Sequence, residues 1–148
     1  MWALLAGAVG TGATLEPSTW APTAANRSLL LGELSLAVAD HDLQLSAAMA
    51  GGLAHELNYE ASLVRHGALD DRAEDRMGAL ILLERAAANA TDIRPDLVAD
   101  LASAVGGLAY EPAELSPAAF GLGAKLLALL PAIQSTFVAP GQRRAALA

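Results

Sequence analysis

Histidines and acidic residues are the side chains of this sequence best suited to metal binding or proton transfer. The 148-residue chain has three histidines and no cysteine. HELNYE (residues 55–60) resembles the zinc motif HExxH, but Tyr59 stands where the second histidine is required. DHD (40–42) lacks the alternating oxygens and glycine of a calcium loop. We therefore expect no metal site, and Glu56 and Glu60, one turn apart, are more typical of a solvated helix face than of acid–base catalysis.

Two glycine-rich segments could be mistaken for phosphate-binding loops. Neither GAVGTG (7–12) nor GLGAK (121–125) contains GxxxxGK[ST], and neither follows a predicted strand. The nucleophile motif GxSxG does not occur. The sequence therefore predicts a protein with no cofactor and no catalytic residues, and it favours a non-enzymatic role.

Modification is the chemistry that the sequence does indicate. Two of the three asparagines, Asn26 (NRS) and Asn89 (NAT), begin N-glycosylation sequons. Helical spacing directs Asn89 away from the expected buried side of its helix, whereas Asn26 lies above Leu30 and Leu34 on the buried side of its own. We expect Asn89 to be the better glycosylation site, and the two sequons favour a location outside the cell.

The elements that position these residues are predicted to be helices. Hydrophobic residues make up 54% of the chain and aromatic residues only 4%, so alanine and leucine must build the core. Both favour helix, and runs of β-branched residues are missing. About five main helical segments with short connections predict an all-α antiparallel bundle or stacked helical hairpins, in a domain spanning 23–138. An apolar, proline-containing arm (1–22) precedes it and a basic tail (139–148) follows.

Apolar periodicity predicts the extent and the buried face of each helix. The first runs to about Ala39, the second covers 43–57, a short piece follows at 59–66, and the third opens at DDRAED with a capping box from Asp71 to Glu74. The expected buried residues of these helices include His41, Leu45, Met49, Leu53, Leu57, Ala73, Met77, Leu80, Ile81 and Ala88. The fourth helix starts at Pro95, ends by Pro112 and buries Leu97, Leu101, Ala104, Val105 and Leu108.

The last helix is the most apolar element. Ser116 is a predicted N-cap with Pro117 at the first helical position, and Pro131 predicts a kink or an early end. Its expected buried face is Ala119, Leu122, Leu126, Leu129, Leu130, Ile133 and Phe137. The uncharged run after Lys125 is short for a membrane span and contains polar residues. Membrane proximity stays open, but no clear transmembrane span is predicted.

Charge and apolar character are unevenly distributed along the chain. The net charge of −7 argues against nucleic acid as a partner, and every acidic residue precedes residue 115. Leu127 lies off the buried stripe of the last helix, and both termini are apolar. We expect a protein partner, or a neighbouring module of the parent protein, to contact Trp2, Leu127 and Phe137 through the N-terminal arm and the last helix. The arm could instead cover that helix within the chain, or act as a signal peptide; the basic tail could dock on the acidic body.

The segments LLLGELSLAVAD, LASAVGGLAYEPAELSPAAF and LLALL resemble the helical part of the extracellular juxtamembrane (GAIN/REJ-like) region of adhesion receptors and polycystin-type proteins. The resemblance spans residues 29–130 and implies a non-enzymatic support for a β-rich module near a membrane. The chain has no cysteine, no β-rich half and no His-Leu-Ser or His-Leu-Thr cleavage tripeptide. Autoproteolysis is therefore not implied.

Together these features predict a non-catalytic structural or interaction domain. We expect it to be a segment or subunit of a larger extracellular or ciliary surface assembly. The alternative is an accessory subunit of an organelle or membrane protein complex.

Overall fold

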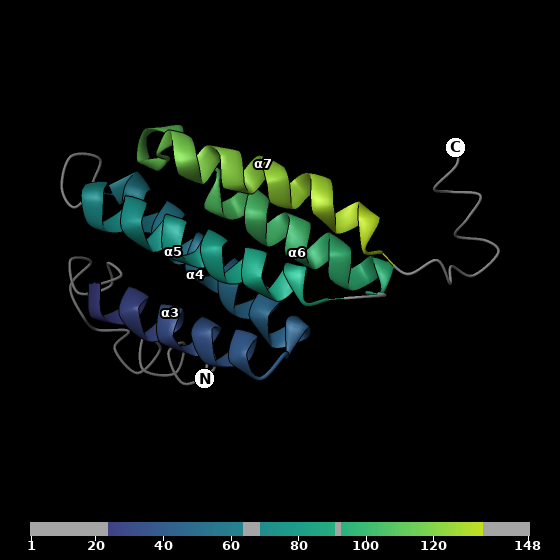
Figure 1. Ribbon diagram of the computed structural model, residues 1–148. Helices are drawn as coiled ribbons and strands as arrows, with labels where there is room; N and C mark the ends of the chain where they lie inside the picture. Colours follow the sequence, from purple (N-terminus) through teal and green to yellow (C-terminus); the bar gives the residue numbers. More distant parts are fainter. Residues whose placement is uncertain (1–23, 64–68, 91–92, 135–148) are drawn as a thin grey trace.

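The computed structural model describes residues 24–63, 69–90 and 93–134, which form an all-α bundle (Figure 1). Five α-helices and one 3₁₀ turn make up this part of the chain, which contains no strand. In chain order they are α3 (Ala24–Ala39), α4 (Leu43–Leu63), α5 (Leu69–Ala88), α6 (Pro95–Leu108), η1 (Pro112–Glu114) and α7 (Pro117–Ala132). The predicted fold class is confirmed, while the N-terminal arm and the basic tail lie outside the described residues.

Consecutive helices run in opposite directions (Figure 1), and each helix packs against at least two others. α3 contacts α4 and α5, α6 contacts α4, and α7 lies across α5 and α6. α3 and α7 therefore occupy opposite sides of the bundle (Figure 1). An isolated bridge between Ile93 and Gln134, with the Ile93 amide donating to the Ile133 carbonyl at 3.0 Å, joins the start of α6 to the end of α7.

Leucine and alanine build the core, as composition requires. Leu34, Leu53, Leu57, Val105 and Leu108 are fully buried and belong to one continuous apolar cluster. Many of the buried residues are alanines, for example Ala50, Ala54 and Ala104, and small side chains of this kind allow helices to pack closely. The expected buried stripes of α3 and α6 are confirmed except for two residues: Leu97 is half-buried and His41 is exposed.

His41 is exposed because α3 ends two residues before it. The His41 amide donates to the Val38 carbonyl and the Asp42 amide to the Ala37 carbonyl, which closes the last turn of the helix. His41 itself adopts a φ of 55°, the left-handed conformation typical of a residue just past a helix end. Asp42 then caps α4 by accepting from the Leu45 amide at 2.9 Å.

α4 is one continuous helix, so the prediction of a separate short piece at 59–66 is wrong. The helix runs through Gly51 and Gly52 to Leu63. Tertiary packing explains this continuity, because Met49, Leu53, Leu57 and Ala61 are all buried along one side. Leu45, expected on that side, is exposed instead.

α5 buries a different face from the one that the sequence predicts. The helix begins at Leu69, so Asp71 lies within its first turn and the expected capping box is wrong. Arg72 and Arg76 point inward and are fully buried, whereas Ile81 is 40% exposed and Ala88 is exposed. Ala73 and Met77 are half-buried, and Leu80 is buried as expected. The inward arginines have carboxylate partners, which the sequence pattern alone does not reveal.

The connection into α7 follows its local sequence closely. Ser116 caps the helix, with its hydroxyl accepting from the Ala119 amide at 3.1 Å, and Pro117 occupies the first turn. The helix ends at Ala132, one residue after Pro131. Both the predicted cap and the predicted early end are confirmed.

Candidate interaction surface

The outer face of α7 carries the one predicted partner residue that the structure describes. Leu127 is 45% exposed, and Phe120, two turns earlier, is 67% exposed. Trp2 and Phe137 lie outside the described residues. Phe120 was not singled out from the sequence; it lies seven residues before Leu127, the spacing that places two residues on one helix face.

α7 buries only one stripe of its circumference. Ala119, Gly123, Leu126 and Leu130 are buried against α5 and α6, with Leu122, Leu129 and Ile133 half-buried beside them. Phe137, the last residue of the predicted stripe, is outside the described part. The opposite side consists of small or apolar residues, and Gly121, Ala124, Ala128 and Pro131 are all exposed there. The exposed face is therefore apolar, and only the small residues Gly121 and Ala124 lie on it between Phe120 and Leu127.

This face is free of uncompensated charge. α7 contains no acidic residue, and its single cation, Lys125, forms an ion pair with Glu84 of α5. Each of the other four helices has at least one acidic side chain outside the core, for example Glu33, Glu56, Glu74 and Asp100. The surface around α7 thus differs in charge from the rest of the described bundle.

A buried ionic cluster fixes the start of α7 to the bundle. Glu114 of η1, two residues before the Ser116 cap, is fully buried. Its carboxylate accepts hydrogen bonds from Arg72 Nε at 2.5 Å and from Arg76 Nε at 2.8 Å, both on α5. Arg76 Nη1 also donates to the carbonyl of Leu108 at the end of α6, at 3.0 Å. The η1 segment, which leads into α7, is therefore bound to α5, and Arg76 of α5 is bound in turn to the end of α6.

The same cluster extends to α3 and α4. Arg27 in the first turn of α3 forms an ion pair with Glu60 near the end of α4, and its Nε donates to Asp75 of α5 at 2.7 Å. Arg72 lies 3.6 Å from the other oxygen of Glu60. Burial opposes the charge on Arg27, but the hydrogen bonds to Asp75 and Glu60 outweigh it and raise the pKa of the guanidinium. We call these six residues, Arg27, Glu60, Arg72, Asp75, Arg76 and Glu114, the ionic cluster.

The sequence analysis did not predict the ionic cluster, and the cluster contradicts the expected exposure of Glu60. Glu60 is buried, not part of a solvated face with Glu56. The hydrogen-bonded partners lie 33 to 48 residues apart in the sequence and Arg72 and Glu60 lie 12 apart, beyond the reach of any local helical pattern. A signal was present in the spacing of Arg72 and Arg76, which places two cations on one side of a helix otherwise rich in apolar residues. The cluster carries three positive and three negative side chains, so its formal charge is balanced.

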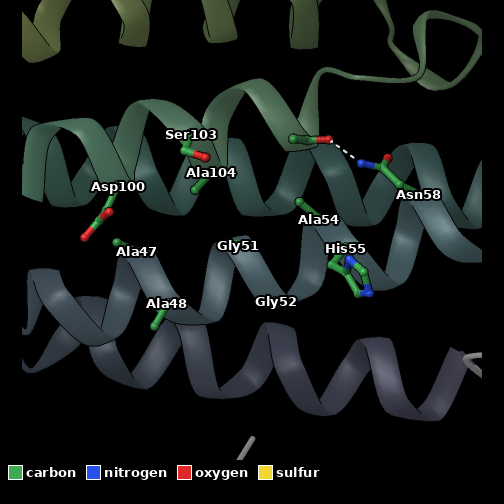
Figure 2. Close-up of a pocket in the computed structure, with 11 residues that line it drawn as sticks. Ala47, Ala48, Gly51, Gly52, Ala54, His55, Asn58, Asp100, Ser103 and Ala104 are labelled. Carbon is green, nitrogen blue, oxygen red and sulfur yellow. Dashed lines mark hydrogen bonds between the residues drawn. The ribbon is translucent and has the colours of Figure 1, made fainter.

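A shallow hollow lies between α4 and α6 on another side of the bundle (Figure 2). It encloses about 420 Å³ and is lined mainly by alanines and glycines. The polar side chains at its edge are spread out, with Asp100 and His55 toward opposite ends (Figure 2). Asn58 points its amide nitrogen at the Gly107 carbonyl, 3.0 Å away. The alanines and glycines that line the hollow have side chains too small to fill the space between α4 and α6 there.

The two sequon asparagines differ in accessibility. Asn89 directly follows α5 and is exposed, with its side-chain nitrogen donating to the Arg85 carbonyl at 3.1 Å. Asn26 is half-buried in the first turn of α3, beside the fully buried Arg27. This difference agrees with the predicted order of glycosylation, whose occurrence stays a prediction.

The described residues contain no group of three or more His, Asp or Glu side chains placed to hold a metal ion. None of the described helices is long and apolar enough to cross a membrane. No family model, no curated protein and no solved structure matches the chain.

Proposed function

We propose that this protein is a non-catalytic interaction domain that binds another protein surface through the outer face of α7. The observation that carries the proposal is the exposure of Phe120 and Leu127 on a helix that has no acidic residue. Large apolar side chains gathered on one exposed face are typical of protein contact sites. Aromatic residues in particular are enriched among those that dominate binding energy.

The rest of the bundle then serves as a rigid support for this face. The ionic cluster connects α3, α4, α5 and η1, and η1 leads directly into α7. A helix held in this way presents a preorganised surface, and binding need not order it.

Site-specific photo-crosslinking tests this function. A photoreactive amino acid is placed at position 120 or 127 in the full chain, expressed in its native cells. The matched control is position 59 on α4, where Tyr59 is 44% exposed, similar to Leu127. We expect protein adducts of defined mass from positions 120 and 127 in clear excess over position 59. Equal yields at all three positions would refute the proposal.

The proposal includes an exterior location, in a cell-surface or ciliary assembly. It is supported by the two sequons, of which Asn89 is exposed. Intact mass of native material before and after glycosidase treatment tests this part separately. An unchanged mass would remove the support for an exterior location and favour a subunit of an internal complex.

A further inference from the structure

We propose that the apolar N-terminal arm, residues 1–22, folds back and packs on the exposed face of α3. This contact lies within the chain and on the side of the bundle opposite α7, so it is independent of the proposed function. It is supported by the exposed residues of α3, by the uncharged sequence of the arm and by the point at which the arm joins the bundle.

The exposed face of α3 is uncharged. Successive residues of a helix are about 100° apart, so one face of α3 consists of the positions within about 60° of Gly32. The only charged residues of α3 are Arg27, which is buried, and Glu33, which is half-buried beside this face. The seven residues of the face are all exposed: Ala25, Ser28, Leu29, Gly32, Ser35, Leu36 and Ala39.

Two leucines form a ridge on this face. Leu29 is 45% exposed and Leu36 is 60% exposed, and they lie about two helical turns apart. Beside them is Gly32, where an added Cβ would meet nothing within 4 Å. A large apolar side chain can therefore rest over Gly32 against the two leucines. Covering the leucines in this way removes apolar surface from water, which is favourable.

The N-terminal arm has the composition that suits such a face. Residues 1–15 contain no charged side chain, and Glu16 is the only charged side chain in the arm. Residues 1–15 and the α3 face can therefore come together without desolvating a charged side chain. The arm contains both tryptophans of the chain among its large apolar residues, which are Trp2, Leu4, Leu5, Val9, Leu15 and Trp20.

The arm is long enough to reach this face. It ends two residues before Ala24, the first residue of α3. Pro17 and Pro22, with serine and threonine between them, are typical of turns and can reverse the chain there. Residues 1–15 would then span about 22 Å as a helix or about 50 Å if extended, whereas Leu29 and Leu36 lie only about 10 Å apart along α3.

Covalent connection to α3 favours the arm over a separate partner. A short flexible connection gives a tethered segment an effective concentration in about the millimolar range. A separate protein would need a similar concentration, or much tighter binding, to displace the arm. The outer face of α7 lies on the opposite side of the bundle (Figure 1), so α3 is the apolar face next to the arm. Trp2 is thereby assigned a contact within the chain instead of the expected contact with a partner.

Tryptophan fluorescence tests this contact, because both tryptophans belong to the arm. In a Trp20→Phe background, Trp2 is the only fluorescent indole. The chain has no cysteine, so a nitroxide quencher can be attached at Leu36→Cys alone. We expect loss of most of the Trp2 emission, and recovery when the nitroxide is chemically reduced. The control is the same label at Leu127→Cys, an exposed position of α7, which should cause little loss.

A charge variant on α3 gives a second readout without a label. Leu36→Asp should release the arm, which shifts Trp2 emission to longer wavelength and raises its quenching by acrylamide. Replacing a leucine buried under the arm by a charged residue should lower the ratio of docked to undocked arm by at least about tenfold. Leu127→Asp should leave the Trp2 emission unchanged. Far-UV circular dichroism checks that both variants fold, which is expected because both positions are exposed.

Three results would overturn the contact. The first is quenching from position 127 that equals or exceeds quenching from position 36. The second is quenching from position 36 that grows with protein concentration, which would place the arm on a second copy. The third is a Trp2 that is as accessible to acrylamide in the native protein as in the urea-unfolded chain.

Failure of this contact is distinguishable from failure of the proposed function. Photo-crosslinking at positions 120 and 127 reports on a separate partner of α7, whereas Trp2 quenching reports on the arm and α3. If the label at position 36 does not quench Trp2 but position 120 captures a protein, the arm contact is refuted and the α7 face stands. If the label quenches and position 120 captures no protein above the Tyr59 control, the arm contact stands and the proposed function is refuted.

Discussion

The ionic cluster is the feature that depends most on individual residues. Three arginines lie fully buried, and each has a carboxylate partner on a different element. A buried charge is tolerated only when it is paired and hydrogen-bonded, since desolvation alone costs several kcal/mol. Glu114 has the central position, because one carboxylate accepts from both Arg72 and Arg76.

Glu114→Gln is therefore expected to destabilise the fold strongly. The amide group would replace one acceptor by a donor and leave the arginines without full neutralisation. We expect a loss of about 3–5 kcal/mol in the free energy of unfolding, measured by urea denaturation with far-UV circular dichroism. The control is Asp96→Asn, which breaks an ion pair between the exposed side chains of Arg94 and Asp96 and should cost less than about 1 kcal/mol. Equal effects of the two substitutions would contradict the importance of the buried cluster.

Glu56 supplies a pH-dependent prediction. Burial raises the pKa of Glu56 above its ordinary value, and the nearby charges of His55 and Glu60 modify it in opposite directions. A carboxyl with a raised pKa in the folded state contributes stability at low pH that is lost as the pH rises through that pKa. Glu56→Gln should thus be more stable than the wild type at pH 7. The difference should vanish near pH 3.5, below the ordinary glutamate pKa of about 4.3. A constant difference across this range would argue against the shift.

Glycosylation is predicted at Asn89 before Asn26. Asn89 is exposed just after α5, whereas Asn26 lies half-buried beside Arg27. A glycopeptide map of native material should show occupancy at Asn89 that equals or exceeds that at Asn26. Occupancy of Asn26 alone would mean that the start of α3 is remodelled when the chain is modified.

At the scale of elements, the sequence predicted most helices but not the orientation of every one. Caps and prolines are local signals, so the starts of α6 and α7 were predictable from Pro95, Ser116 and Pro117. The α5 face was not, because its buried arginines depend on Glu60 and Glu114, which are distant in the sequence. The α7 surface was predicted in part: Leu127 lay off the apolar stripe, but recognising that Phe120 shares its exposed face requires knowing which side of the helix is buried.

Replacing the helical glycines by alanine tests the effects of helix propensity and of packing separately. An added Cβ at Gly51 or Gly106 would meet nothing within 4 Å, whereas at Gly107 it would lie 3.0 Å from the Ala54 Cβ across the α4–α6 contact. Gly51→Ala and Gly106→Ala should each stabilise the protein by about 0.5–1 kcal/mol, because glycine is unfavourable within a helix. Gly107→Ala, only one residue further, should lose this gain. If thermal denaturation shows that Gly106→Ala and Gly107→Ala stabilise equally, the close approach of α4 and α6 is wrong.

At the scale of the whole molecule, the buried ionic cluster is electrically neutral, whereas the surface carries an excess of negative charge. The ionic cluster has no formal net charge, while the chain carries −7. Acidic side chains are exposed on several elements, including Asp40, Asp42, Asp71, Asp96 and Asp100. Their mutual repulsion opposes the compact state, since unfolding lets the charges separate.

Salt is therefore expected to stabilise this protein. At about 10 mM ionic strength the screening length is ~30 Å, so repulsion acts across the whole bundle; at about 150 mM it falls to ~8 Å. The buried ion pairs are shielded from solvent and respond much less. We expect the midpoint of thermal unfolding to rise by about 2–5 °C between these two conditions. The control is Asp40→Asn combined with Asp42→Asn, which removes two exposed acids and should reduce the salt response. A midpoint that falls as NaCl is added would show that attraction in exposed ion pairs, such as Arg94–Asp96 and Lys125–Glu84, outweighs the repulsion among the exposed acids.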